Sequence, residues 1–253
     1  MITHEIIGDD MQAVVFTMGT GDEVRAQAGA MTYMTDGIGM DARLEGGIMG
    51  GLKRAVAGQS LFLTFFKCST PAGKVAFSAP YPGKIITLPL SNSAILCQRD
   101  SLLCATGQVD ITVEFTKRLG AGFFGGEGFI LERLQGTGDV FAHSGGTIVQ
   151  MDLKPGEKLK VDTGCLVAFD PTIDYDVEFV GGIKTALFGG EGLFFAAMTG
   201  PGRVWIQTLP FSRLADRVLA AFHGNKEEVT RGDVGGALGG ALGALGGLIG
   251  GDR

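Results

Sequence analysis

Hydrophobic and polar residues alternate over short stretches along most of the chain. Residues 23–28 read Glu-Val-Arg-Ala-Gln-Ala, with an apolar side chain at every second position, and residues 110–115 and 175–180 alternate in the same way. This period is typical of a half-buried strand. Residues 13–16 and 61–66 are continuous runs rich in β-branched and aromatic side chains, which fit a pleated surface. The pattern predicts many short strands.

Turn residues separate these stretches in the later part of the chain. The strand-like residues 84–88 lead to Ser91–Ser93, and residues 147–153 lead to Lys154–Glu157. The Pro-Gly pair in the second turn suits a type II turn, because proline presets φ and glycine accepts a positive φ. Since no long helical pattern lies between the strands, we predict an all-β fold, an antiparallel β-sandwich or double-stranded β-helix-like barrel, rather than a parallel α/β sheet.

Similar segments recur at a long spacing. The motif Phe-Gly-Gly-Glu-Gly at residues 124–128 returns at residues 188–192, and a weaker copy contains Gln59. A second element, at residues 99–105, resembles residues 161–168. A fixed long period indicates a structural unit that is copied along the chain. We predict three β-units, at residues 1–75, 76–142 and 143–210.

Five polar residues in these repeats are candidates for ligand or inter-unit contacts. They are Glu127, Glu191, Gln59, Asp100 and Asp162. Glycines beside the two glutamates allow tight turns, and a carboxylate there can accept backbone N–H groups. The residues either form turns and contacts between units or recognise a ligand repeated around an assembly. Gln59 keeps the hydrogen-bonding shape without the charge, which favours the structural interpretation, and the aspartates are also interpreted as turn formers.

The C-terminal part differs from the rest. Residues 211–224 carry an amphipathic helical pattern that Ser212 can cap and Gly224 can end. Residues 225–253 form a charged linker and then a Gly/Ala/Leu-rich tail.

The tail, at residues 234–251, has a helical distribution of small and apolar residues. At ~100° per residue its glycines fall on one side of a helix and its alanine, leucine and isoleucine residues on the other, as in the small-residue packing of membrane helices. Each glycine costs about 1 kcal/mol in a helix, so this glycine zipper needs a surface on which to fold. Three interpretations stay open: it docks on its own oligomer or a protein partner, it meets a membrane, or it is mobile.

Composition excludes several classes of function. The net charge is −6 and no cluster of Lys and Arg occurs, which argues against a nucleic-acid partner. The N-terminus lacks the basic start and apolar stretch of a signal peptide, so we expect a cytoplasmic protein, peripheral to a membrane at most. The four cysteines have no paired spacing and predict buried free thiols.

Motifs for catalysis and cofactors are weak. Residues 120–125 spell Gly-x-Gly-x-x-Gly, but a strand pattern follows where a dinucleotide site needs a helix. The three histidines, His4, His143 and His223, are isolated, whereas a metal site needs converging ligands. No nucleophile-elbow motif occurs. We therefore expect no enzymatic activity, no cofactor and no metal.

An ordered set of motifs resembles a known family. The motifs are Gly50–Arg54, Gly58–Phe62, both Gly-Gly-Glu-Gly copies, Val161-Asp162 and Gly202–Gln207. Over about residues 5–210 the chain resembles the uncharacterised bacterial family related to the mitochondrial biogenesis (altered inheritance of mitochondria) proteins. It departs from that family at Gln59, where glutamate is more usual, and in the tail.

The resemblance implies three repeated TRAP-like units, named after the tryptophan RNA-binding attenuation protein, and a homotrimer with a pseudo-ninefold ring. It implies no established enzymatic activity, and the mitochondrial relatives are linked to inner-membrane organisation. RNA and tryptophan binding do not follow, because the acidic chain lacks the basic surface and the matching motif. Our hypothesis is a ring-like scaffold attached to a partner or membrane through its tail. The alternative is a small-molecule binding protein with ligand sites between units, near Glu127 and Glu191.

Overall fold

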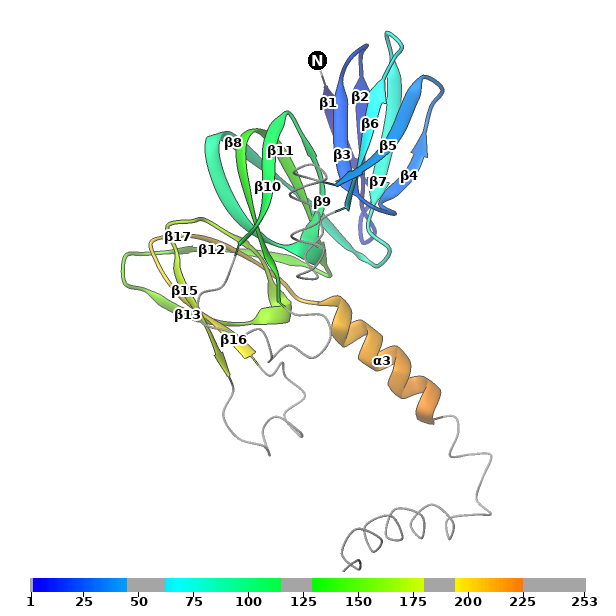
Figure 1. Ribbon diagram of the computed structural model, residues 1–253. Coiled ribbons are helices and arrows are strands. Elements are labelled where there is room, and N and C mark those ends of the chain that lie inside the picture. Colours follow the sequence, from blue (N-terminus) through cyan, green and yellow to red (C-terminus); the bar gives the residue numbers. More distant parts are fainter. Residues whose placement is uncertain (1, 45–61, 115–128, 180–193, 225–253) are drawn as a thin grey trace, which may run out of the picture. The chain divides into compact units, whose positions relative to one another are not determined.

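The computed structural model describes residues 2–44, 62–114, 129–179 and 194–224. Strands make up nearly all of the regular structure, and one helix, α3 (Phe211–Gly224), follows them (Figure 1). The all-β class and the C-terminal helix are as predicted. Residues 1–211 form one compact unit, and α3 after its first residue, Phe211, belongs to a second unit that begins at residue 212. In the described part of the chain, no helix is long and apolar enough to cross a membrane.

The strands fall into three successive segments of the chain, coloured blue to cyan, green, and yellow-green to yellow in Figure 1. The first segment contains β1 (Thr3–Ile7), β2 (Ala13–Met18), β3 (Glu23–Gln27), β4 (Met31–Met34), β5 (Ile38–Leu44), β6 (Phe62–Cys68) and β7 (Gly73–Ser78). The second contains β8 (Gly83–Gln98), the single-turn helix η1 (Arg99–Ser101), β9 (Leu102–Thr106), β10 (Gln108–Glu114) and β11 (Leu131–Gly145). The third contains β12 (Ile148–Leu153), β13 (Lys158–Asp162), the single-turn helix η2 (Thr163–Cys165), β14 (Leu166–Phe169), β15 (Asp174–Phe179), β16 (Phe194–Thr199) and β17 (Gly202–Gln207).

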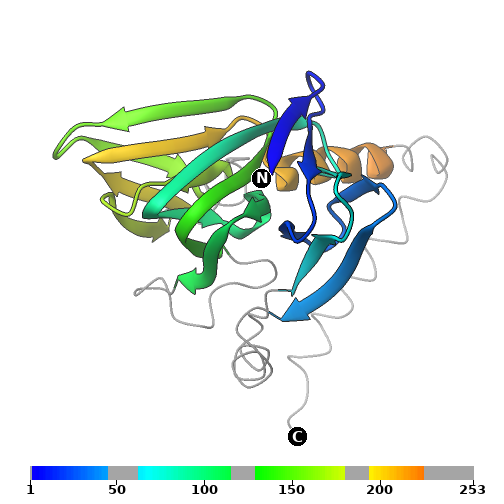
Figure 2. The ribbon, with the colours of Figure 1, turned by 90° about the horizontal axis from the view of Figure 1, so that it is seen from above.

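One scheme of antiparallel pairing occurs in each segment. In the first segment, β7 lies between β2 and β4, and β6 lies between β3 and β5. In the third, β17 lies between β12 and β14, and β16 lies between β13 and β15. The second segment builds the same two layers from longer strands, because one half of β11 lies between β8 and β9 and the other half between β8 and β10. Figure 2 shows β8 and β11 side by side along their curved course.

A β-bulge recurs at one point of this scheme. Pairing skips Thr32 in β4, Leu103 in β9 and Val167 in β14. A bulge is a specific local feature, so its repetition fixes which residues of the three segments correspond. The two following positions are therefore equivalent across the segments. They are Tyr33, Cys104 and Ala168, and then Met34, Ala105 and Phe169.

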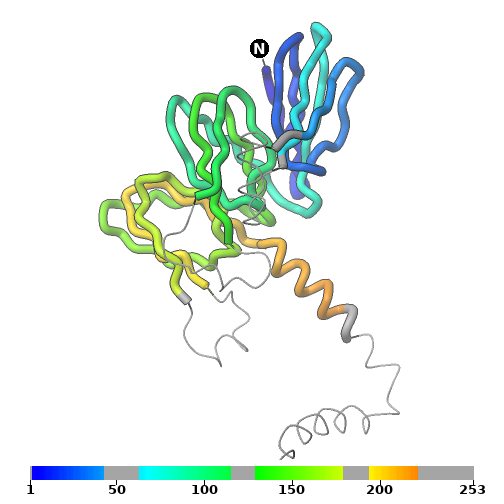
Figure 3. Tube along the Cα trace, in the orientation of Figure 1, coloured from blue at the N-terminus to red at the C-terminus, as the bar shows by residue number. Residues whose placement is uncertain are grey.

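Backbone pairing also joins neighbouring segments. β9 of the second segment pairs with β3 of the first, with Arg25 opposite Ala105. β14 of the third segment pairs with β8 of the second in the equivalent register, with Leu96 opposite Phe169. One sheet of ten strands therefore passes through all three segments, and the tube in Figure 3 follows the chain through them.

The core consists of three clusters of buried apolar residues that cross the segment boundaries. Phe141 of the second segment packs into the first cluster, and Trp205 of the third packs into the second. In the opposite direction, Leu63 of β6 packs into the second cluster and Leu131 of β11 into the third. Each segment thus completes its neighbour's core, so we expect them to unfold together.

Two predicted features differ from the structure in detail. Ser91–Ser93, predicted as a turn between strands, is instead a bend within the continuous strand β8. Pairing skips Asn92, whose φ of 51° lies in the left-handed region that asparagine tolerates. The predicted unit boundaries after residues 75 and 142 fall inside β7 and β11, which continue to Ser78 and Gly145. All four cysteines are buried thiols outside any disulfide, as predicted.

Leu131→Ala tests the shared core. Leu131 is fully buried, so the truncation should lower the free energy of unfolding by about 2–5 kcal/mol. Because the segments share one sheet, far-UV circular dichroism and Trp205 fluorescence should report the same shifted urea transition. Asp110→Ala, at an exposed position of the neighbouring strand β10, is the control and should change the unfolding free energy by at most about 0.5 kcal/mol. Two separate transitions in the Leu131→Ala variant would contradict a shared core.

Candidate functional site

Three of the five candidate site residues, Glu127, Glu191 and Gln59, lie outside the described residues, together with the repeated Gly-Gly-Glu-Gly motif. Their roles therefore stay predictions. The other two, Asp100 and Asp162, lie in the single-turn helix η1 and just before η2.

Asp162 and Asp100 have local partners. The Asp162 carboxylate caps η2, because its Oδ1 accepts a hydrogen bond from the Gly164 N–H at 2.9 Å. Asp100 is exposed, and its Oδ2 accepts a bond from the Gln98 side chain at 3.3 Å. The pairing register makes Asp162 equivalent to Gln98 rather than to Asp100. The structure thus brings the two aspartates to different positions of the pairing scheme, each with contacts typical of a turn.

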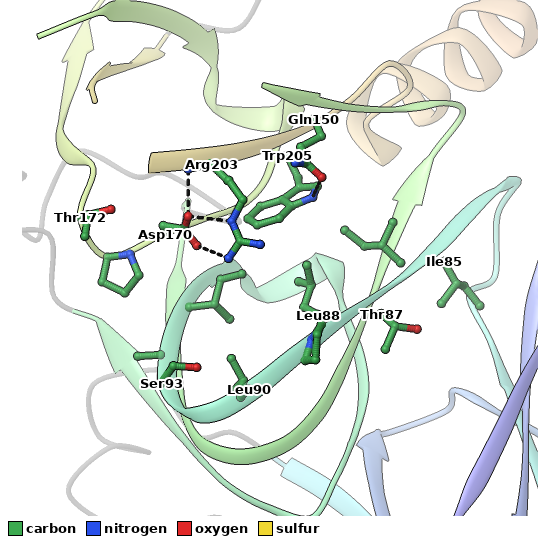
Figure 4. A pocket seen from close by; sticks show the side chains of 15 residues that line it. Ile85, Thr87, Leu88, Leu90, Ser93, Gln150, Asp170, Thr172, Arg203 and Trp205 are labelled. Carbon is green, nitrogen blue, oxygen red and sulfur yellow. Dashed lines mark hydrogen bonds and ion pairs between the residues drawn. The ribbon is translucent and has the colours of Figure 1, made fainter. Parts of the chain in front are cut away.

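A pocket of about 630 Å³ lies between the second and third segments (Figure 4). One wall is β8, on both sides of its bend. The opposite wall comes from β12, β17 and the residues that follow β14. The lining residues are Ile85, Ile86, Thr87, Leu88, Pro89, Leu90, Ser93, Ala94, Ile95, Gln150, Asp170, Pro171, Thr172, Arg203 and Trp205. The β8 wall is mainly aliphatic, and the polar groups gather on the other wall.

An ion pair and a stacked indole define the polar wall. The Arg203 guanidinium donates from Nε and Nη2 to the two carboxylate oxygens of Asp170, each at 2.9 Å, and the Arg203 backbone N–H donates to the same carboxylate. The hydrogen bond that Arg203 donates to Asp170 raises the pKa of Arg203, and burial opposes this. The guanidinium carbon lies 5.0 Å from the centre of the Trp205 ring, and the Trp205 indole N–H donates to Gln150 Oε1 at 3.1 Å. Trp205 is therefore held from two sides.

This lining favours binding over catalysis. Its ionisable side chains are Asp170 and Arg203, which are already paired with each other. General acid–base catalysis needs a group poised to exchange a proton, and nucleophilic catalysis needs an activated nucleophile beside a base. The described lining residues provide neither arrangement. They offer an aliphatic surface, a fixed aromatic ring and the amide of Gln150.

Glu132 is a buried carboxyl group that the sequence analysis missed. Its side chain is 0% exposed, and neither oxygen has a hydrogen-bond partner among the described residues. Burial raises its pKa to about 8; the nearby Arg99 charge opposes this and Asp100 adds to it. A sequence signal existed, because Glu132 and Leu134 are two residues apart in one strand and so share a face. Leu134 is core, and Glu132 is therefore core as well.

Glu132→Gln should remove a pH-dependent loss of stability. The folded-state pKa, near 8, exceeds the ordinary value of 4.5, so between these values the unfolded chain loses a proton that the folded chain keeps. The wild type should therefore lose stability as pH rises. Relative to Glu132→Gln, we expect a loss of about 2–3 kcal/mol between about pH 5.5 and pH 8, measured by urea unfolding. Comparing the two proteins cancels the contribution of His143, whose pKa is lowered to about 4 by burial.

The control for this experiment is Glu5→Gln, at an exposed position of β1. It should keep the pH dependence of the wild type. Parallel stability curves for the wild type and Glu132→Gln would contradict a protonated Glu132 in the folded state.

The fold defines an all-β protein built from three segments with one pairing scheme and a shared sheet. The mitochondrial biogenesis AIM24 family matches residues 4–209, and the chain belongs to this family. An uncharacterised protein of Streptococcus pyogenes serotype M6 is 28% identical over 203 residues, which are 77% of this chain and 80% of that protein. A crystal structure of a Streptococcus pyogenes protein superposes with a TM-score of 0.73 at 25% identity, covering 87% of this chain and all of the other. The family resemblance seen in the sequence is confirmed.

Proposed function

We propose that this protein is a non-enzymatic scaffold whose chains join end to end in a ring-shaped homotrimer. One observation supports this proposal above all. Within the chain, β9 pairs with β3 and β14 pairs with β8. In each pair, a strand equivalent to β4 in one segment meets a strand equivalent to β3 in the segment before it. This contact occurs twice, and it leaves β4 at the start and β13 at the end without such a partner among the described strands.

β4 and β13 are equivalent to the two kinds of strand that pair with each other between segments. β4 corresponds to β9 and β14, which pair with the preceding segment, and β13 corresponds to β3 and to the end of β8, which pair with the following segment. Inside the chain, Arg25 lies opposite Ala105 and Leu96 opposite Phe169. The same register between two chains places Lys160 of one chain opposite Met34 of the next. An interface between unlike surfaces continues from chain to chain until a ring closes.

The side chains at these two edges suit a covered surface. Tyr33 and Met34 of β4 are 44% and 39% exposed, whereas their equivalents in β9 and β14 are buried. Phe195 of β16 is half-buried, and its equivalents Leu63 and Leu131 each pack into the core of the following segment. Positions that are buried at both contacts between segments thus carry exposed or half-buried apolar side chains at the two ends of a single chain. A second chain would bury them.

Cysteine cross-linking tests this register. A chain with Met34→Cys and Lys160→Cys should form disulfides between chains under mild oxidation, because directly opposed residues in antiparallel strands have Cβ atoms about 5 Å apart. Non-reducing electrophoresis should show dimers and trimers. The native cysteines are buried, so they should contribute little.

The matched control carries Met34→Cys and Lys158→Cys. Lys158 lies on the same face of β13, two residues out of register, so this control should cross-link several-fold less. Equal cross-linking in both variants, or none in either, would count against the proposed edge pairing.

The tail at residues 234–251 lies outside the described residues. Its attachment to a protein partner or a membrane therefore stays a prediction from the sequence. As the alternative function, ligand binding between segments is supported by the pocket beside Trp205, which lies between the second and third segments. The predicted location near Glu127 and Glu191 stays open.

A further inference from the structure

β1 is an addition to the repeated pairing scheme. It pairs along the outer edge of β2, and neither of the other two segments has a described strand at the equivalent edge. Its His4 lies opposite Phe16 and packs edge-on against Phe141, with ring centres 4.8 Å apart. The His4 Nε2 atom lies 3.5 Å from the Thr87 hydroxyl. β1 thus places a ring side chain between the first segment and two residues of the second.

The pocket beside Trp205 is the equivalent place one segment later. The pairing registers make Leu88 equivalent to Phe16 and Trp205 equivalent to Phe141. They also make Gln150 equivalent to Thr87. Leu88, Trp205 and Gln150 all line the pocket. The His4 side chain is exposed, and the three residues that it contacts have their counterparts around this pocket, where no described strand takes the place of β1.

The neighbouring edge of β8 presents backbone groups to this space. The Ile85 N–H donates to Gln12 Oε1 at 2.7 Å, outside the ladder with β11. Because backbone groups alternate along a strand, those of Thr87 and Pro89 point to the same outer side. Pro89 fits this orientation, since a proline at an open edge removes no hydrogen bond from the ladder. Thr87 thus offers an N–H and a C=O, and Pro89 offers a C=O.

We infer that this pocket is a groove for an extended peptide of a partner protein, which adds as a strand to β8 in the way that β1 adds to β2. Addition of a strand to an open sheet edge is an established mode of peptide recognition, in which the backbone supplies affinity and side-chain pockets supply specificity. The peptide carries a histidine or an aromatic residue at the position of His4. That ring packs against Trp205 and Leu88, and Gln150 provides the polar contact.

The groove lies within one chain, so it does not depend on the ring. A trimer that binds no peptide would contradict only this inference. A monomer that binds the peptide would contradict only the proposed ring.

The test uses a synthetic peptide with the sequence of residues 2–8. Trp205 is the single tryptophan of the chain, so its fluorescence reports on the groove directly. Titration into the intact protein should give a saturable change in emission. A peptide with His4→Phe should bind comparably, whereas one with His4→Ala should bind about tenfold more weakly.

Two variants of the protein separate strand addition from simple filling of the pocket. Thr87→Pro removes the outward N–H and should weaken binding about tenfold or more. Thr87→Val keeps the N–H, so it should bind the peptide clearly more tightly than Thr87→Pro. In the wild-type protein, peptide should also slow amide hydrogen exchange at Thr87, which needs no variant that could fail to fold. The inference would be overturned if Thr87→Pro left binding unchanged and the peptide gave Thr87 no added protection. It would also be overturned if neither the residue 2–8 peptide nor its His4→Phe form changed the emission up to about 1 mM.

Discussion

Antiparallel backbone pairing between segments is the constraint on which the rest of this structure depends. β9 pairs with β3, and β14 pairs with β8, in one register. Each contact aligns an open edge with its partner and brings a side chain of one segment into the core of another, as with Phe141 and Trp205. Three segments that would each have an incomplete core thereby become one folded unit. The same geometry leaves β4 and β13 as the two ends at which the contact can continue to another chain.

This constraint also creates the pocket. The contact of β9 with β3 and the contact of β14 with β8 share one register, so equivalent residues meet beside each of them. Beside the first contact, the exposed His4 of β1 packs against Phe141 and lies near Thr87. Beside the second contact lies the pocket, which is lined in part by Leu88, Trp205 and Gln150. We propose that a peptide of a partner takes at the second contact the place that β1 takes at the first.

The sequence predicted the strands and the helix much better than the site. Alternation at residues 23–28 predicted β3, and the amphipathic pattern of residues 211–224 predicted α3. The bend of β8 was predicted as a turn, because Ser91–Ser93 carries turn residues and only the pairing with β11 shows that the strand continues. The pocket could not be predicted from the sequence, because Leu88, Gln150 and Trp205 are distant in the sequence and are brought together only by the registers of strand pairing. Local patterns do not show which strands pair or in which register. The burial of Glu132, in contrast, could have been predicted, because Glu132 shares a strand face with Leu134.

We propose that the contact between segments inside the chain also joins separate chains and closes after three. Sedimentation equilibrium over a range of protein concentrations tests this most directly. We predict a single species with the mass of three chains, because the family resemblance implies a ring of nine segments and each chain supplies three. A stable monomer at all concentrations would contradict the claim, and would mean that the exposed Tyr33 and Met34 of β4 are covered by something other than a second copy.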